Sequence, residues 1–216
     1  MGPMDQLKQA LLDYDDVGAE AAARAIVDQG IDPVAGMDVV TAALREIGDG
    51  FACGDLYLPE LLVSARVALG ALAILDAEIA RSGRERGYKG TVVIGTVYGD
   101  VHSVGKTMVS SLMSAHGFKM VDLGENVATE QFLAAIEEHH PDILAMSALL
   151  TTTAPEQRKV IQALKDAGLR NRVKVMVGGG AITQDFADDM GADGYAPTAP
   201  EAATLAAELI AGQGGS

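Results

Sequence analysis

Asp100, His102 and Gly105 have the residue types and the spacing for chemistry at a metal. A neutral histidine ring binds transition metals through one nitrogen, and its other nitrogen usually needs a carboxylate or a similar partner. Asp100, two residues before His102, is the candidate for that partner. A pattern as short as Asp-x-His-x-x-Gly recurs by chance, so the metal interpretation depends on support from elsewhere in the chain.

Two later motifs give that support. Forty-one residues separate Gly105 from the motif Ser147-Ala148-Leu149, and twenty-eight residues separate Leu149 from the pair Gly178-Gly179. Each motif alone is most simply explained by packing or by a turn at the end of a strand. The ordered set of three at these spacings is much more specific, and it predicts one site built from three segments.

The first part of the chain has helical periodicity, with apolar residues at mostly three- and four-residue steps. Short connections between the helices favour a small antiparallel four-helix bundle. The polar, glycine-rich stretch 82–87 predicts a linker, and we therefore expect a helical domain over residues 1–85. The four expected helices run from Met4 to Leu12, from Val17 to Gln29, from Pro33 to about Phe51 and from Pro59 to about Arg81.

From Lys89 onward, short β-rich runs alternate with helical stretches. Five β-α repeats predict an α/β domain over residues 86–216: a flavodoxin-like (Rossmann-like) doubly wound parallel sheet with strand order 2-1-3-4-5 and helices on both faces. The expected strands are 91–96, 119–123, 142–147, 173–177 and, more weakly, 194–196, and the expected helices are about 105–116, 129–139, 155–167, 183–190 and 199–211.

Such sheets bind their ligands outside the carboxyl ends of the strands. The segment 100–105 follows the first expected strand, Ser147 ends the third, and Gly178-Gly179 follow the fourth. The three motifs therefore converge on one edge of the sheet, and we expect the site there.

The three motifs at these spacings resemble the cobalamin-binding signature of corrinoid proteins and of the cobalamin module of methionine synthase. In the helical half, Gly54–Leu61 resembles a segment of methyltransferase corrinoid proteins, and residues 177–179 and 191–195 also look like that group. The resemblance extends through almost the whole chain. It points to the small stand-alone corrinoid proteins that serve methylamine, methanol, betaine and aryl methyl ether (O-demethylase) systems.

This resemblance implies a cobamide cofactor, with His102 as the lower ligand of cobalt. It also makes Thr153 a hydroxyl that hydrogen-bonds Asp100, in a relay that takes up a proton when His102 leaves cobalt. Gly178-Gly179 then leave room for the displaced nucleotide tail, and Ser147 bonds its base. The cofactor-binding residues implied in this way are Asp100, Val101, His102, Ser103, Val104, Gly105, Ser147, Leu149, Thr151, Thr153, Gly178, Gly179, Gly180, Tyr195 and Ala196.

In this family the helical half caps the upper face of cobalt and shields the methyl group from water and oxygen. Phe51, Leu58 and Leu62 are the implied cap residues, and burial in the bundle core is the alternative for each. The stretch 82–87 is then the hinge that lets the cap move aside. Ser103, which follows the histidine where the family often has Asp, departs from the common pattern and puts details of the lower corrin face in doubt.

The function that the resemblance implies is that of a methyl carrier, which cycles between cob(I)alamin and methylcobalamin and is accidentally oxidised to cob(II)alamin. Its expected partners are a substrate-specific methyltransferase, a second methyltransferase to tetrahydrofolate or coenzyme M, and a reductive activase. The chain is not expected to catalyse transfer alone, because a methyl-donor TIM barrel needs about 250 further residues. Two alternatives stay open: a cobalamin subunit of an adenosylcobalamin-dependent mutase, and a cobalamin-dependent sensor.

Composition narrows the partners further. The net charge of −14 disfavours nucleic acid and anionic membranes as partners. Cys53 is the one cysteine, so an internal disulfide is excluded and a reducing, cytoplasmic compartment is expected. No apolar run is expected to span a bilayer. The methyl donor and acceptor, the lower base of the cobamide and the oligomeric state stay open.

Overall fold

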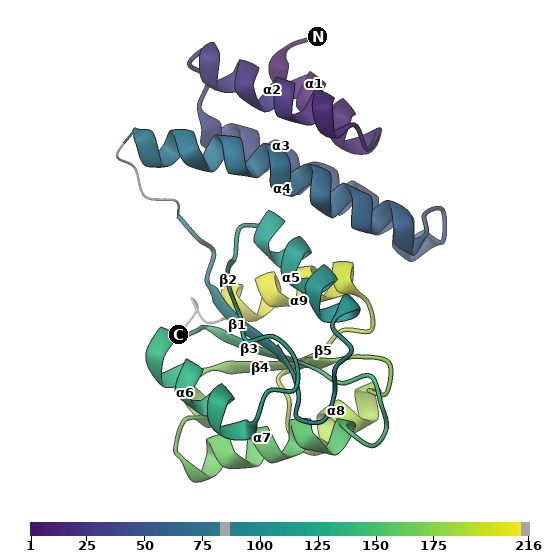
Figure 1. The fold of residues 1–216 in the computed structure, drawn as a ribbon, viewed down its shortest axis with the longest axis vertical. Helices are drawn as coiled ribbons and strands as arrows, with labels where there is room; N and C mark the ends of the chain where they lie inside the picture. Colours follow the sequence, from purple (N-terminus) through teal and green to yellow (C-terminus); the bar gives the residue numbers. More distant parts are fainter. Residues whose placement is uncertain (83–86, 213–216) are drawn as a thin grey trace. The chain divides into compact units, whose positions relative to one another are not determined.

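The computed structural model describes residues 1–82 and 87–212, and the chain separates into two compact units (Figure 1). The first unit contains Met1–Tyr88 with Ser114–Gly117, and the second contains Lys89–Met113 and the chain from Phe118 onward. The predicted boundary between residues 85 and 86, and residues 83–86 of the predicted linker and hinge, lie outside the described residues.

The first unit is built from four helices, as the periodicity predicts. The Asp15 and Asp32 carboxylates cap the second and third helices by accepting hydrogen bonds from the backbone N–H groups of Gly18 and Val34. Gly54 ends the third helix with a φ of 83°, a conformation that favours glycine. Leu7, Leu11, Ile26, Leu44 and Leu75 are among the fully buried side chains of this unit. The helices are α1 (Pro3–Leu12), α2 (Asp16–Asp28), α3 (Pro33–Cys53) and α4 (Leu58–Arg81).

One of these helices corrects an expectation. By length and composition alone, α4 is apolar enough to cross a membrane, with a mean hydropathy of 1.8 over its most apolar window. Within the first unit, however, α4 packs against α2 and α3 and buries residues such as Leu61, Leu72 and Ile79. A core helix of a bundle passes the same test, so its apolar composition is explained by burial in the bundle.

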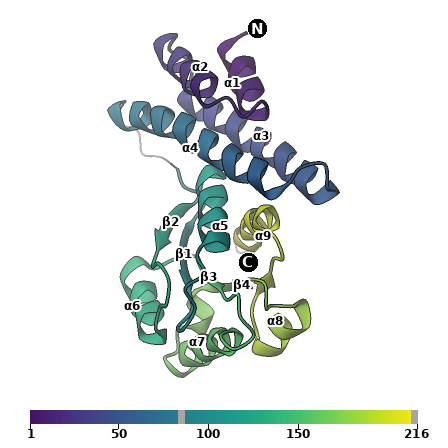
Figure 2. The same ribbon diagram turned by 45° about the vertical axis from the view of Figure 1, so that its right-hand side comes forward.

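The second unit is a five-stranded parallel sheet with the order β2-β1-β3-β4-β5, which confirms the predicted topology. Helices α6 and α7 cover one face and α5 and α9 cover the other (Figures 1 and 2). The strands are β1 (Thr91–Thr96), β2 (Lys119–Asp122), β3 (Ile143–Ser147), β4 (Lys174–Gly178) and β5 (Gly194–Tyr195). The helices are α5 (Val104–Ala115), α6 (Thr129–His139), α7 (Ala154–Asp166), α8 (Gln184–Met190) and α9 (Ala199–Ala211), with a short 3-10 turn, η1, at Arg170–Arg172.

The central strands are buried on both faces, which explains their nearly continuous apolar sequence. Val93, Leu144 and Val175 lie side by side in β1, β3 and β4 and belong to one core cluster. Phe132 of α6 and Ile161 of α7 belong to the same cluster. This core fixes the strand ends, and hence the loops that follow them.

Candidate functional site

The loop between β1 and α5 carries Asp100 and His102. Gly99 has a φ of 78°, which glycine adopts without the steric cost that a Cβ would bring. The turn is closed by a hydrogen bond of 3.1 Å from the Asp100 backbone N–H to the Val97 carbonyl. The turn leaves the Asp100 side chain fully buried, whereas the His102 side chain is 46% exposed.

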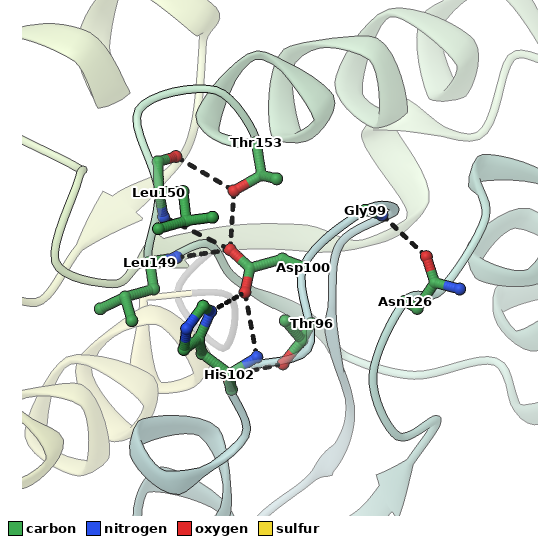
Figure 3. A network of polar contacts seen from close by, with 8 residues as sticks. All are labelled: Thr96, Gly99, Asp100, His102, Asn126, Leu149, Leu150 and Thr153. Carbon is green, nitrogen blue, oxygen red and sulfur yellow. Dashed lines mark hydrogen bonds and ion pairs between the residues drawn. The ribbon is translucent and has the colours of Figure 1, made fainter.

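Asp100 uses both carboxylate oxygens to join three segments of the chain (Figure 3). Its Oδ1 accepts from the His102 backbone N–H at 3.0 Å and lies 2.8 Å from His102 Nδ1. Its Oδ2 accepts from the Thr153 hydroxyl at 2.6 Å and from the Leu149 backbone N–H at 2.8 Å. The carboxylate is therefore held by donors from its own loop, from the segment after β3 and from the start of α7.

These contacts decide the charge of Asp100. Burial acts to raise the pKa of its carboxyl, but hydrogen bonds from Thr153, from the backbone and ring of His102, and from Leu149 outweigh burial and hold the pKa well below its usual range. An ionised carboxylate only accepts hydrogen bonds, so the proton shared with His102 sits on Nδ1. The other ring nitrogen, Nε2, is then the one with a lone pair for a metal.

A metal at His102 has to bring most of its own ligands. Within residues 1–82 and 87–212, no group of three or more His, Cys, Asp or Glu side chains is placed to hold a metal ion. A bare ion would need such a group. A cofactor that carries its metal together with most of the metal's ligands would need only a single exposed, oriented imidazole, such as the His102 ring held by Asp100.

The sheet brings the later motifs to the same edge. Ser147, the last residue of β3, lies in register with Thr96 of β1 on one side and with Gly178 of β4 on the other. Gly178 is therefore the last residue of β4, whereas the sequence predicts that it follows the strand. A Cβ on Gly178 would lie 3.1 Å from the Ala196 carbonyl oxygen, so the space beside it is already narrow.

The glycines differ in what they make possible. Gly179 has a φ of 113°, and a Cβ there would lie 2.1 Å from the Ala148 carbonyl oxygen. Backbone packing inside the domain therefore requires this glycine, independently of the ligand room that we predicted for it. A Cβ on Gly180 would meet Leu149 at 2.9 Å, whereas one on Gly105 would have nothing within 4 Å. Among the motif glycines, Gly105 is the one that borders open space.

Apolar side chains in the loops around His102 are exposed. Large apolar side chains that gather on a surface mark a binding region. Thr151 is exposed as well, and Ser103 is half-buried. Ala196 is buried, and Tyr195 is half-buried and packs against the core cluster that contains Phe132 and Ile161. The exposed apolar side chains are Tyr98, Val101, Val104, Leu149 and Leu150.

The predicted cap residues lie in the first unit. Leu58 and Leu62 are 43% and 40% exposed, so the alternative that they belong to the bundle core is wrong. Phe51 is half-buried near the end of α3. Their role over cobalt stays a prediction.

Two polar residues at this edge were missed from the sequence. Asn126, in the loop after β2, accepts a hydrogen bond from the Gly99 backbone N–H at 2.8 Å. Gln157, fully buried on α7, donates from Nε2 to the carbonyls of Met146 at 3.0 Å and Gly178 at 3.1 Å. The available signals were weak: Asn126 follows a glycine-containing turn sequence, and Gln157 lies one helical turn after Thr153, on the same face.

Two family models match the chain, one over the sheet domain and one over the helical part. Residues 90–204 match the B12 binding domain family, and residues 4–76 match a second family of the same description. The chain is 41% identical over 216 residues to a corrinoid protein of Desulfitobacterium hafniense (strain Y51), covering 97% of this chain and 98% of the relative. It is also 41% identical over 196 residues to the trimethylamine corrinoid protein of Methanosarcina barkeri, covering 90% of each chain.

A solved structure shares the whole fold. The methanol:cobalamin methyltransferase complex of Methanosarcina barkeri contains a chain that is 30% identical, with a TM-score of 0.84. The match covers 97% of this chain and 80% of that chain. The helical part and the sheet domain therefore occur together in a known structure.

Proposed function

This chain belongs to the corrinoid proteins with B12 binding domains, its cofactor is a corrinoid of the cobalamin type, and we propose that it is a methyl carrier with His102 as the lower cobalt ligand. The observation that carries this proposal is the buried Asp100 carboxylate. It binds the Nδ1 side of a ring that is otherwise half-exposed, and so directs Nε2 outward.

The cofactor, when bound, supplies the chemistry of reversible methyl transfer at cobalt. The protein supplies ligand orientation and control of a proton. Asp100, kept ionised by Thr153 and by the backbone of Leu149, holds His102 in the tautomer whose Nε2 binds metal. Whether or not Nε2 binds metal, Asp100 Oδ1 can accept from Nδ1–H, so the proton on Nδ1 and the orientation of the ring are kept.

The remaining residues of the site are assigned by their place at the sheet edge. Gly105 borders open space at the start of α5, and Ser147 and Gly178 lie side by side at the ends of β3 and β4. We assign this edge, where Gly178 contributes no side chain, to the nucleotide tail of the cobamide. The exposed Val101, Val104 and Leu149, and the nearby Thr151, are assigned to the lower face and edge of the corrin.

The proposed partners follow from the relatives. A methyltransferase is named in the structure that shares this fold, and a relative is named for trimethylamine. We propose that a substrate-specific methyltransferase loads this carrier from a methylamine or from methanol. A second methyltransferase, acting on tetrahydrofolate or coenzyme M, unloads it, a reductive activase restores oxidised cofactor, and the exchange takes place in the cytoplasm.

The test is the identity of the nitrogen on cobalt. Protein containing 15N-histidine is loaded with unlabelled cobalamin, passed through gel filtration and reduced to the Co(II) state for EPR spectroscopy. A histidine ligand gives the doublet of 15N, whereas the cofactor's own base gives the triplet of 14N. We expect the doublet in the wild type and in His139→Ala, a histidine at the end of α6, and its loss in His102→Ala.

Two results would overturn the proposal. If no corrinoid stays with the wild-type protein through gel filtration, the carrier function fails. If the doublet persists in His102→Ala, the protein binds a corrinoid through another residue and the assignment of the ligand is wrong.

A further inference from the structure

Asn126 holds the Asp100 turn from outside the loop that contains His102. Its Oδ1 accepts from the Gly99 backbone N–H at 2.8 Å (Figure 3). Its own backbone N–H donates to the Asp100 carbonyl at 2.9 Å. The two partner groups stand on either side of the Asp100 Cα. One asparagine thus fixes the backbone from which the buried carboxylate projects.

The conformation of Asn126 suits it to this task. Its φ is 54°, in the left-handed region that asparagine tolerates better than most residues. In this conformation the backbone N–H and the side-chain amide of one residue both face the β1–α5 loop. A residue with a branched or long apolar side chain would lack the acceptor and would be strained at this φ.

The segment that carries Asn126 is itself tied to both ends of the β1–α5 loop. At the strand end, Thr96 donates its N–H to the Gly124 carbonyl and accepts from Val127 N–H, at 3.0 and 2.9 Å. At the helix end, Lys106 in the first turn of α5 is buried and forms an ion pair with Asp122, the last residue of β2. Asn126 is the part of this brace that reaches the Asp100 backbone.

We propose that Asn126 is a positioning residue that keeps Asp100 directed at His102 Nδ1 before a cofactor arrives. The inference rests on the proposed function and goes beyond it, because Asn126 is not among the residues assigned to the cofactor. A purely structural role would lower stability without changing which nitrogen binds cobalt. A positioning role changes the ligand and the affinity as well.

Three variants separate these roles. Asn126→Gly keeps the left-handed backbone and removes the acceptor for Gly99 N–H. Asn126→Asp keeps an acceptor oxygen at the same position and serves as the rescue. Asn171→Gly, which changes an exposed asparagine in η1, is the matched control. The measurements are the Kd for cobalamin, the 15N-histidine doublet in the Co(II) EPR spectrum, and the Tm of each cofactor-free protein.

We expect Asn126→Gly to raise the Kd about tenfold, equivalent to about 1.4 kcal/mol, and to lower the share of the cobalt signal that shows the doublet. Asn126→Asp and Asn171→Gly are expected to match the wild type. Equal Kd values and equal doublets in Asn126→Gly and Asn171→Gly would overturn the inference. Failure of the wild type to bind cobalamin would instead overturn the proposed function.

A measurement on the cofactor-free wild type keeps the inference testable if Asn126→Gly does not fold. The Gly99 amide should be protected from hydrogen exchange, because its acceptor is the Asn126 side chain. In a folded Asn126→Gly protein its exchange should be about tenfold faster, in line with the loss of a hydrogen bond of ordinary strength. A Gly99 amide that exchanges at the unprotected rate in the wild type would show that Asn126 does not hold the turn.

Discussion

The Thr153 hydroxyl lies 2.6 Å from Asp100 Oδ2, in a buried contact between residues 53 positions apart in the chain. Thr153 occupies the N-cap position of α7, but its side chain makes no capping hydrogen bond to that helix. Its hydroxyl instead donates to the carboxylate. The residue at the start of α7 thus links the two segments that build the site.

Thr153→Val tests the weight of this contact, because valine keeps the shape of threonine and removes the hydroxyl. A buried carboxylate then loses a donor, and we expect the free energy of unfolding at pH 7 to fall by about 1.5–3 kcal/mol. Urea unfolding measures the loss. Thr151→Val, two residues earlier and exposed, is the control and should differ little from the wild type. Equal losses in the two variants would contradict the importance of the hydrogen bond.

The pKa of Asp100 gives a prediction for acid stability in the cofactor-free protein. The folded pKa of its carboxyl is depressed below the unfolded value of about 3.9, so this group stabilises the fold above that value and loses its contribution as pH falls through the folded pKa. Asp100→Asn removes the contribution at every pH. The difference in unfolding free energy between the wild type and this variant should therefore narrow as pH falls from about 5 toward 2.

Urea unfolding at a series of pH values measures this difference. Asp185→Asn, an exposed residue in the first turn of α8, provides the comparison and should follow the wild type throughout. A gap between wild type and Asp100→Asn that stays constant with pH would mean that the carboxyl is not held in its ionised form.

Two glycines of the signature predict opposite outcomes. Gly179→Ala places a Cβ against the Ala148 backbone in a left-handed conformation, and we expect a loss of about 3 kcal/mol or more of stability. Gly105→Ala meets no protein atom and lies in a helix, so its stability should hold or rise by about 0.5–1 kcal/mol. Its cost should appear in cobalamin binding, where a methyl group intrudes on open space at the site.

Thermal unfolding and cobalamin titration distinguish these two effects. Tight cobalamin binding by Gly105→Ala would show that the open space beside this residue is not used by the cofactor. A stable Gly179→Ala protein would show that the backbone approach between Gly179 and Ala148 is not as close as the structure has it.

Gln157 links α7 to the ends of two strands, so removing its hydrogen bonds should lower the free energy of unfolding. Gln157→Met keeps the volume and removes the donor to the Met146 and Gly178 carbonyls, with an expected loss of about 1–3 kcal/mol. Gln162→Met, an exposed position on the same helix, is the matched control for urea unfolding. A loss no larger than that of the control would contradict a tie between α7 and the strands.

The parts that the sequence predicts well are those set by periodicity over many residues. The sheet order and the elements from β1 to α9 follow from alternating β-rich and helical runs, whose apolar positions must face one core. Asp100 and His102 are close in sequence, so their pairing was predictable as well. Asn126 and Gln157 were missed because their contacts join segments 27 and 11 to 21 residues apart, and only tertiary packing sets such distances.

Gly179 shows a different limit. Its place in the motif predicted room for a ligand, but the steric reason in the structure is the Ala148 backbone, which no local pattern reveals. A glycine in a binding signature therefore has at least two physical explanations. The two explanations are distinguished by whether a Cβ at that position would contact the protein's own backbone, as at Gly179, or open space, as at Gly105.

The exposed leucines of α4 give the last prediction. Leu58 and Leu62 are too exposed to contribute much to the bundle core, so Leu62→Ala should change the free energy of unfolding by no more than about 0.5 kcal/mol. If this side chain shields cobalt, as the predicted cap requires, the same variant loaded with cobalamin should lose its Co(I) state to oxygen faster than the wild type.

Val34→Ala, at a similarly exposed apolar position of α3, controls for the loss of surface hydrophobicity. The decay of the Co(I) absorption after a defined oxygen pulse measures the rate. An equal rate in Leu62→Ala and Val34→Ala would remove Leu62 from the cap, whereas a faster rate with unchanged stability would assign the exposed face of α4 to protection of the cofactor.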